Sequence, residues 1–122
     1  MIESYKDLIV WQKSMNLVED IYKTTHAFPL KEQFVLTSQI RRAAISIPSN
    51  IAEGYGRNTT KNYIQFLTVS RGSLLELETQ IELCRRLKYL SDEKFKEIEM
   101  KIIEISKMLT ALINKLKKKP NE

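Results

Sequence analysis

YIQFLTVSRGSLLELETQIELCRRLK, residues 63–88, is the stretch of the chain that decides its fold. Its periodic positions follow alternating steps of three and four residues: Tyr63, Leu67, Ser70, Leu74, Leu77, Ile81, Cys84 and Lys88. This spacing places them on one side of an α-helix. A helix that keeps this spacing over roughly 30 residues is about 45 Å long. The stretch therefore predicts one long helix that packs against its neighbours along a continuous seam.

The same period continues on both sides of this stretch. Before it, a stripe that continues to about Gly54 carries Leu36, Ile40, Ala43, Ile47 and Ile51. After it, a further stripe carries Phe95, Ile98, Ile102, Ile105, Leu109, Leu112 and Leu116. The first helix is predicted from about Lys6 to Thr25, with a stripe of Leu8, Trp11, Met15, Val18 and Tyr22. Each segment has the period of an amphipathic helix, so the sequence predicts four helices.

The predicted helices are separated by residues that interrupt or cap a helix. Residues 54–56, Gly-Tyr-Gly, suit left-handed backbone angles at a helix end. Asn58 or Thr59 then offers a side-chain oxygen to cap the third helix, and Ser91 does so for the fourth. Pro48 lies inside the second helix, where it removes a backbone donor, so we expect a bend or a locally opened turn there.

Four amphipathic helices joined by short connections predict an all-α, antiparallel up-down-up-down four-helix bundle, because short loops make sequential helices run antiparallel. The 122 residues are 43% hydrophobic, enough for one core and no second domain. Only 3 Gly and 3 Pro occur, which argues against many short strands. Residues 1–116 are expected to form the bundle, and residues 117–122 a basic, frayed C-terminal tail.

The charge balance of the chain is basic. It has 20 Lys+Arg against 15 Asp+Glu, a formal net charge of +5, and a sequence pI near 9.3. An acidic partner fits this balance, although charge alone is equally compatible with mere solubility. The lone Cys84, the absence of an apolar signal core in residues 1–10 and the absence of an apolar run of membrane-spanning length predict a cytoplasmic protein with no membrane role.

The inventory of reactive residues is poor for an enzyme. His26 is the only histidine and stands beside a turn, and Cys84 falls on the apolar seam, where cysteine behaves as a small buried hydrophobe. A nucleophile, a base and an orienting group are not available together, and one histidine cannot complete a di-iron bundle. We therefore predict a non-enzyme with no catalytic residues, no metal, no cofactor and no small-molecule substrate.

Polar residues are threaded through the otherwise apolar helices. Steps of three or four residues on the second helix align Gln39, Arg42, Ser46, Asn50, Glu53 and Arg57. Small residues nearby permit close helix approach: Ala43, Ala44, Gly72 and Ser73. An interhelical hydrogen-bond network or a subunit interface is the preferred interpretation for Arg41, Ser46, Asn50, Glu53, Arg71 and Glu76.

Several cations remain as candidates for contacts with nucleic-acid phosphates. The predicted binding residues are Arg42, Arg57, Lys61, Arg85, Arg86 and Lys88, and the tail from Lys115 to Lys119 adds to them. Tyr55 and Tyr63 would either stack on bases or pack internally. One open cationic patch would favour nucleic acid, whereas scattering, or pairing with Glu53, Glu78 and Glu82, would favour a scaffold.

Four stretches of the chain carry a resemblance to a known family. They are WQK at 11–13, LTSQIRRAAISIPSNIAEG at 36–54, FL at 66–67 and RGSLLELETQ at 71–80. Together they resemble the bacterial four-helix bundle family labelled ribosomal RNA intervening-sequence proteins, over nearly the whole chain. The resemblance implies a bundle that assembles as a homopentameric ring, with residues 41–53 and 71–76 as fold and assembly residues.

The family is also distantly similar to the accessory variability determinant of diversity-generating retroelements, a basic barrel that binds nucleic acid and a reverse transcriptase. Charge and resemblance together predict a non-enzymatic, oligomeric nucleic-acid-binding accessory protein. We expect it to bind RNA rather than DNA, to associate with copies of itself, and to have a reverse transcriptase as a candidate partner. The alternative is a protein-interaction scaffold without nucleic-acid binding.

Overall fold

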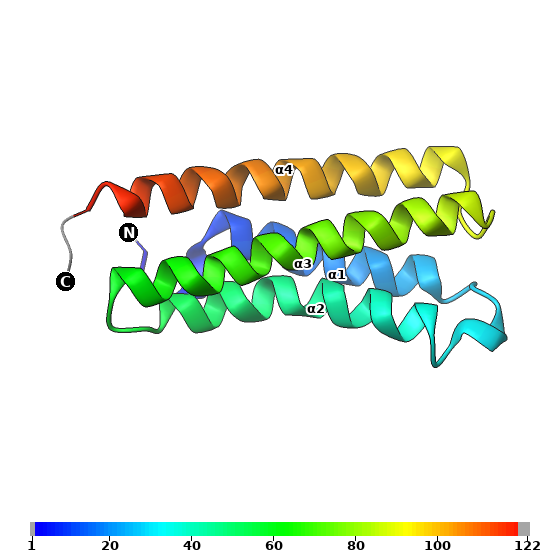
Figure 1. The fold of residues 1–122 in the computed structure, drawn as a ribbon, viewed down its shortest axis with the longest axis horizontal. Coiled ribbons are helices and arrows are strands. Elements are labelled where there is room, and N and C mark those ends of the chain that lie inside the picture. Colours follow the sequence, from blue (N-terminus) through cyan, green and yellow to red (C-terminus); the bar gives the residue numbers. More distant parts are fainter. Residues whose placement is uncertain (1, 120–122) are drawn as a thin grey trace.

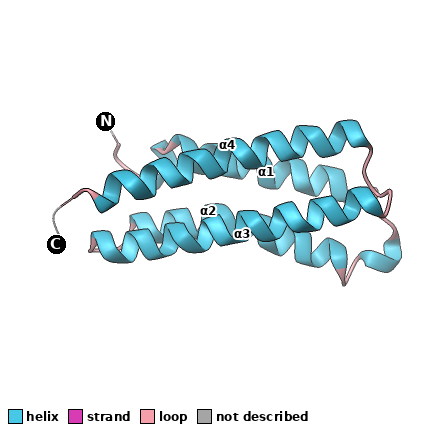
Figure 2. Ribbon diagram, turned by 45° about the horizontal axis from the view of Figure 1, so that its top comes forward, coloured by secondary structure: helices cyan, strands magenta, loops and turns pink. Residues whose placement is uncertain are grey.

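The computed structural model describes residues 2–119 and contains four α-helices and two short 3-10 helices in that range. The elements are η1 (Tyr5–Asp7), α1 (Ile9–Thr25), η2 (Leu30–Glu32), α2 (Leu36–Tyr55), α3 (Thr60–Arg86) and α4 (Asp92–Lys117). Successive helices run in opposite directions, so η1 and the end of α4 lie at the same end of the bundle (Figure 1). Helices α1 and α3 each pack on α2 and α4, which closes the bundle (Figure 2). The predicted antiparallel four-helix bundle is therefore confirmed.

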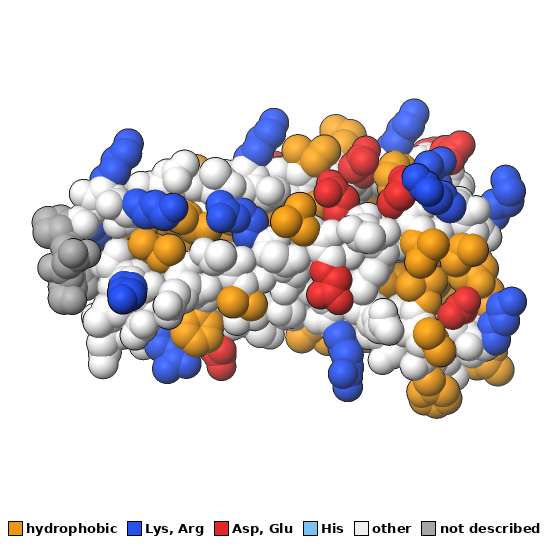
Figure 3. Space-filling model, viewed as in Figure 1, with side chains coloured by type: hydrophobic (Ala, Val, Ile, Leu, Met, Phe, Trp, Pro, Cys, Tyr) orange, Lys and Arg blue, Asp and Glu red, His pale blue; other side chains and the backbone are white. Residues whose placement is uncertain are grey.

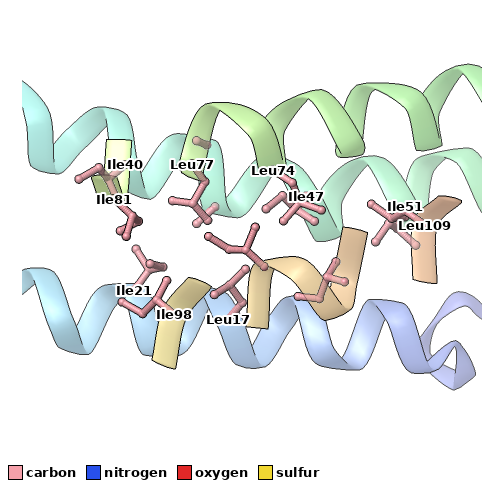
Figure 4. Close-up of a cluster of buried hydrophobic side chains, with 14 of the residues drawn as sticks. Leu17, Ile21, Ile40, Ile47, Ile51, Leu74, Leu77, Ile81, Ile98 and Leu109 are labelled. Atoms are coloured by element: carbon pink, nitrogen blue, oxygen red, sulfur yellow. The ribbon is translucent and has the colours of Figure 1, made fainter. Parts of the chain in front are cut away.

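Three of the four predicted stripes form the core. Their side chains point toward one another in the middle of the bundle (Figure 4). The predicted residues of α2 are all buried, as are those of α3 from Leu67 to Cys84. In α4 the buried residues are Ile98, Ile102, Ile105, Leu109, Ile113 and Leu116, while Phe95 and Leu112 are half-buried.

The predicted stripe of α1 is only partly correct, because Leu8, Trp11 and Val18 pack against the core while its fully buried residues are others. The residues of α1 that are buried are Val10, Ser14, Leu17, Ile21 and Thr25. By contrast, Met15 and Tyr22 are 38% and 39% exposed, and Trp11 and Val18 are half-buried. Two apolar stripes lie side by side on this helix, and packing against α2 and α4 selects the one with fewer aromatic residues. The helix also starts later than predicted, at Ile9, because Leu8 is extended after η1.

The caps of α3 and α4 are those expected. The Thr59 side chain accepts a hydrogen bond from the Asn62 N–H, and Ser91 accepts one from the Lys94 N–H, each at 3.1 Å. The expectation of left-handed glycines at residues 54–56 is wrong, because Gly56 has a φ of −80° and neither glycine has a positive φ. Gly54 serves close packing instead: a Cβ there would lie 2.8 Å from Phe66 Cβ.

The end of α4 lies one residue into the segment expected as a tail. Helix α4 includes Lys117, so the helix continues into the segment expected as a tail, and residues 120–122 of that tail lie outside the described residues.

Helix α2 continues without interruption through Pro48, which is buried, and Ser70 Oγ donates to the Ile47 carbonyl beside it at 2.8 Å. A side chain of α3 thus bonds to backbone next to the proline.

Candidate nucleic-acid interface

The cations predicted from the sequence do not form one patch. Arg57 and Lys61 lie at the turn between α2 and α3, whereas Arg85 and Arg86 end α3 at the opposite end of the bundle. Lys61 and Arg85 are separated by about 36 Å along the helix at 1.5 Å per residue. Arg42 is exposed in the first half of α2. The predicted set is therefore divided between two ends.

Arg85 and Arg86 are engaged by a carboxylate of their own helix. Arg85 Nη2 lies 2.6 Å from Glu82 Oε2, and Arg86 Nε lies 2.9 Å from the same atom. Hydrogen bonds from Arg85 and then Arg86 lower the pKa of Glu82 to about 2. The Arg85 guanidinium also lies 5.3 Å from the centroid of the Phe95 ring. These two arginines show the pairing with Glu82 that the scaffold alternative requires.

Lys88 lies beyond the end of α3 and is not part of its helical seam, contrary to the sequence prediction. Its φ is 64°, and its N–H donates to the Arg85 carbonyl at 3.1 Å. The next N–H, of Tyr89, reaches back to the Cys84 carbonyl at 2.9 Å. This pair of bonds ends a helix with one left-handed residue, so the chain turns away before Lys88 can join the seam.

A different set of cations lies on two stretches of the chain that contain no carboxylates, and we call this set the basic face. Residues 54–75 and 105–119 contain no Asp or Glu. The start of α3 lies beside the end of α4, so these two stretches are neighbours (Figure 1). The basic face consists of Arg57, Lys61, Arg71, Lys107, Lys115, Lys117, Lys118 and Lys119. In Figure 3, Lys and Arg occur over both halves of the molecule, whereas the acidic side chains lie mostly over the right half.

The cations of the basic face are available to a ligand. All are exposed except Arg71, which is half-buried. None lies within 4.0 Å of a carboxylate of residues 2–119. Arg57 is held in place by Phe66, whose ring centroid lies 4.6 Å from its guanidinium carbon. Of the predicted binding residues, Arg57 and Lys61 belong to this face.

Cations elsewhere connect helices. Asp20 of α1 accepts hydrogen bonds from Lys94 and Lys101 of α4 at 2.9 and 3.1 Å, and its side chain is 13% exposed. Burial would raise the pKa of Asp20, but the two lysines outweigh it and hold that pKa below its usual value. The lysines of this cluster thus stabilise the α1–α4 contact and are not available to a ligand.

Replacing Asp20 with Asn is expected to lower the free energy of unfolding at pH 7 by about 1–3 kcal/mol, because two lysines lose their charged acceptor. The pKa of Asp20 is lower in the folded state, so the carboxylate stabilises the fold above pH ~4 and this contribution disappears as pH falls below that value. Urea unfolding at pH 7 and pH 3 should therefore show a difference between wild type and D20N that shrinks at pH 3. The exposed Glu104, 3.2 Å from Lys13, supplies the control E104Q, which should change stability by less than about 0.5 kcal/mol. If wild type and D20N differ in stability by the same amount at pH 7 and pH 3, the charged contacts of Asp20 with the two lysines are not the cause.

The polar ribbon is only partly an interhelical network. The hydroxyls of Ser46 and Ser73 lie 2.8 Å apart, and Asn50 Nδ2 donates to Ser46 Oγ at 3.0 Å. Glu76 accepts from Gln80 of its own helix at 3.2 Å. Arg41 donates to Thr25 of α1. Of the other predicted members, Glu53 is exposed and Arg71 is half-buried. Their role in a subunit interface stays a prediction.

Two candidate residues from the sequence, Cys84 and Tyr63, pack within the bundle. Cys84 is fully buried, and burial raises the pKa of its thiol to about 11, which keeps it protonated. Tyr63 packs edge-to-face against Tyr55, with centroids 6.1 Å apart, and burial raises its pKa to about 12. Within residues 2–119 there is no cluster of three His, Cys, Asp or Glu side chains suited to a metal ion. No helix in the same range is long and apolar enough to cross a membrane.

Comparison with known proteins decides the family. Residues 6–111 match the model of the family described as 23S rRNA-intervening sequence protein. The chain belongs to that family. A crystal structure of a protein of unknown function from the S23 ribosomal protein family of Bacteroides thetaiotaomicron is 29% identical, with a TM-score of 0.78. The alignment covers 86% of this chain and 98% of that one. A comparison with curated proteins finds no match.

Membership of the intervening-sequence protein family confirms the resemblance seen in the sequence. The distant similarity to the retroelement accessory protein stays a prediction, as do the pentameric ring and the reverse-transcriptase partner. The signal that sequence reasoning missed is the pair of stretches without carboxylates. Both are visible in the sequence, but they become one surface only when α3 and α4 are placed side by side.

Proposed function

We propose that this chain is a non-enzymatic, oligomeric RNA-binding accessory protein that contacts phosphate groups through its basic face. The main support for this proposal is that residues 54–75 and 105–119 contain no Asp or Glu. These two stretches lie on neighbouring helices. Exposed Lys and Arg side chains on such a surface bind phosphates without reading sequence. This affinity falls steeply with salt because binding releases counterions.

Association with copies of itself would strengthen this binding. Hydrophobic side chains remain uncovered in the groove of about 350 Å³ between α1 and α2 that includes Trp11, Met15 and Ile45. Exposed apolar patches of this kind mark interaction surfaces. A ring, for which five copies is our proposal, would present several basic faces to one RNA, so that weak contacts add through multivalency.

The test compares two variants of equal net charge. The first replaces Lys115, Lys117 and Lys118 of the basic face with Gln, and the control replaces the exposed Lys23, Lys31 and Lys96 near the other end. Binding to a labelled structured RNA and to duplex DNA is measured across a salt series. We expect the first variant to lose about ten-fold or more in RNA affinity and its salt slope to fall by about two to three, because each lost phosphate contact removes about one unit. The control should stay close to wild type.

An equal loss of RNA affinity in both variants would mean that binding depends on net charge alone. It would contradict a specific role for the basic face. An absence of RNA binding even at low salt would exclude the proposed function. The alternative, a protein-interaction scaffold, would then remain, and it is favoured by the pairing of Arg85 and Arg86 with Glu82. The mass of the protein in solution, measured on the same samples, tests whether the assembly is a pentamer.

A further inference from the structure

A second surface, away from the basic face, has the features of a ligand site. Two adjoining hollows of about 270 and 290 Å³ lie where the end of α1, η2 and the start of α2 meet. They share Gln33, Thr37 and Arg41, and we call them together the Arg41 cleft. Among residues 2–119, no Asp or Glu lines either hollow. Each hollow approaches about 300 Å³, the lower end of the range of small-molecule sites.

Arg41 is fixed in the cleft with part of its hydrogen-bonding capacity left over. Its Nε donates to Thr25 Oγ1 at 2.9 Å, and its guanidinium carbon lies 4.5 Å from the Tyr22 ring centroid. Within residues 2–119 no carboxylate lies within 4.0 Å of it, and Nη1 makes no hydrogen bond. A guanidinium held in this way is preorganised for an oxyanion such as phosphate.

A buried hydroxyl beside Arg41 also lacks a partner. Thr37 is 6% exposed and lines both hollows, yet its Oγ1 makes no hydrogen bond in the described structure. Buried polar atoms are paired in the large majority of cases, so one without a partner calls for an explanation. Helix α2 starts next to it without a side-chain cap, and its positive end adds to the attraction for an anion.

The outer part of the cleft presents an aromatic ring and a second cation. Phe34 is 86% exposed, and it lines the larger hollow together with Arg42. An exposed ring beside a cation is the arrangement that binds unpaired bases by stacking while phosphate pairs with the guanidinium. Phe28 and Tyr89 also lie at this end, but they pack against each other in a tilted arrangement with centroids 5.5 Å apart, so Phe34 is the ring available to a ligand.

We propose that the Arg41 cleft binds a phosphorylated nucleoside, with the phosphate between Arg41 and Arg42 and the base on Phe34. The source of this group is either a free mononucleotide or an unpaired nucleotide of an RNA strand. The site is separate from the basic face and does not depend on it. It also departs from our expectation of no small-molecule ligand.

The test uses two probes and two variants. The probes are uridine 5′-monophosphate, followed by calorimetry, and single-stranded octauridylate with a 3′ fluorescent label, followed by anisotropy. The variants are F34A and R42Q; Arg41 is left intact because it also holds Thr25 and Tyr22. Their controls are L75A and K31Q, which change an exposed apolar residue and an exposed cation outside the cleft. Thermal unfolding of each variant verifies that the fold is kept.

We expect F34A to weaken binding by about five-fold or more and R42Q by about ten-fold, with the controls unchanged. Binding of both probes indicates a free-nucleotide site, and binding of the octamer alone indicates an unpaired nucleotide within a strand. The proposal is overturned if wild type binds neither probe, if F34A binds as wild type does, or if F34A lowers the mass of the protein in solution, which would make Phe34 a contact between copies. If the lysine variant of the basic face loses binding to structured RNA while F34A and R42Q bind as wild type does, the proposed function holds and the Arg41 cleft is excluded.

Discussion

Replacing Leu77 with Ala is expected to lower the free energy of unfolding by about 2–5 kcal/mol. Leu77 is 0% exposed and lies in the middle of the core, close to Leu74 and Ile47 in Figure 4. Removing its side chain takes away apolar surface that was buried and leaves a cavity, which rigid neighbouring helices fill only in part. The effect is large because the residue lies where the seams of several helices meet.

Urea unfolding at one protein concentration measures this loss, since association makes stability depend on concentration. The matched control is L75A, two positions away on α3, where the side chain is 62% exposed. It should change the stability of the fold by no more than about 0.5 kcal/mol. Comparable losses at the two positions would mean that α3 does not present Leu77 to the core.

Two glycines of the bundle are expected to respond to alanine with opposite signs. At Gly54 an added Cβ would lie 2.8 Å from Phe66 Cβ and 3.2 Å from the Tyr63 carbonyl oxygen. These atoms belong to or adjoin the backbone of α3, so the two helices must separate, at a cost of about 1–3 kcal/mol. At Gly72 no described atom lies within 4 Å of an added Cβ, and alanine should stabilise the helix by about 0.5–1 kcal/mol.

Thermal unfolding of G54A and G72A measures this contrast, because both substitutions add the same methyl group to a helix. Destabilisation by G72A would contradict the expectation and would indicate a close contact at Gly72 in an assembly, which the mass in solution would then reveal. A stabilised G54A would mean that α2 and α3 do not approach as closely as described. The sequence interpretation that Gly72 permits close helix approach is not supported within this chain.

Most of the fold was accessible from local pattern. The seams through Ile47, Leu74 and Ile105 follow the period of a helix, and each helix has one broad apolar side that leaves little choice of orientation. The caps at Thr59 and Ser91 were also predictable, since their hydroxyls bond to backbone only three residues away.

Helix α1 shows where local pattern fails. Its sequence offers the stripe through Trp11 and Met15 and the stripe through Leu17 and Ile21, and both have helical spacing. Only the second is fully buried. The choice depends on how much side-chain volume fits between α2 and α4, which a single helix cannot reveal. The larger side chains of the first stripe are left to line a surface groove.

The candidate sites also differ in how far the local sequence pattern predicts them. Pairing of Glu82 with Arg85 and Arg86 follows from helical spacing and was one of the two alternatives that the sequence left open for these arginines. The basic face needed the register of two antiparallel helices. The Arg41 cleft needed contacts between Arg41 and Thr25, 16 positions apart, which no periodicity encodes.

The sequence by itself determined four helices, their antiparallel order and three of their buried seams, because hydrogen bonds and amphipathic period are set by residues within a few turns of one another. The tertiary structure alone decided which side of α1 is buried, why Gly54 must be small, and which cations share a surface. Those outcomes depend on packing density and on distances between residues far apart in the chain, and they exist only once the helices have met.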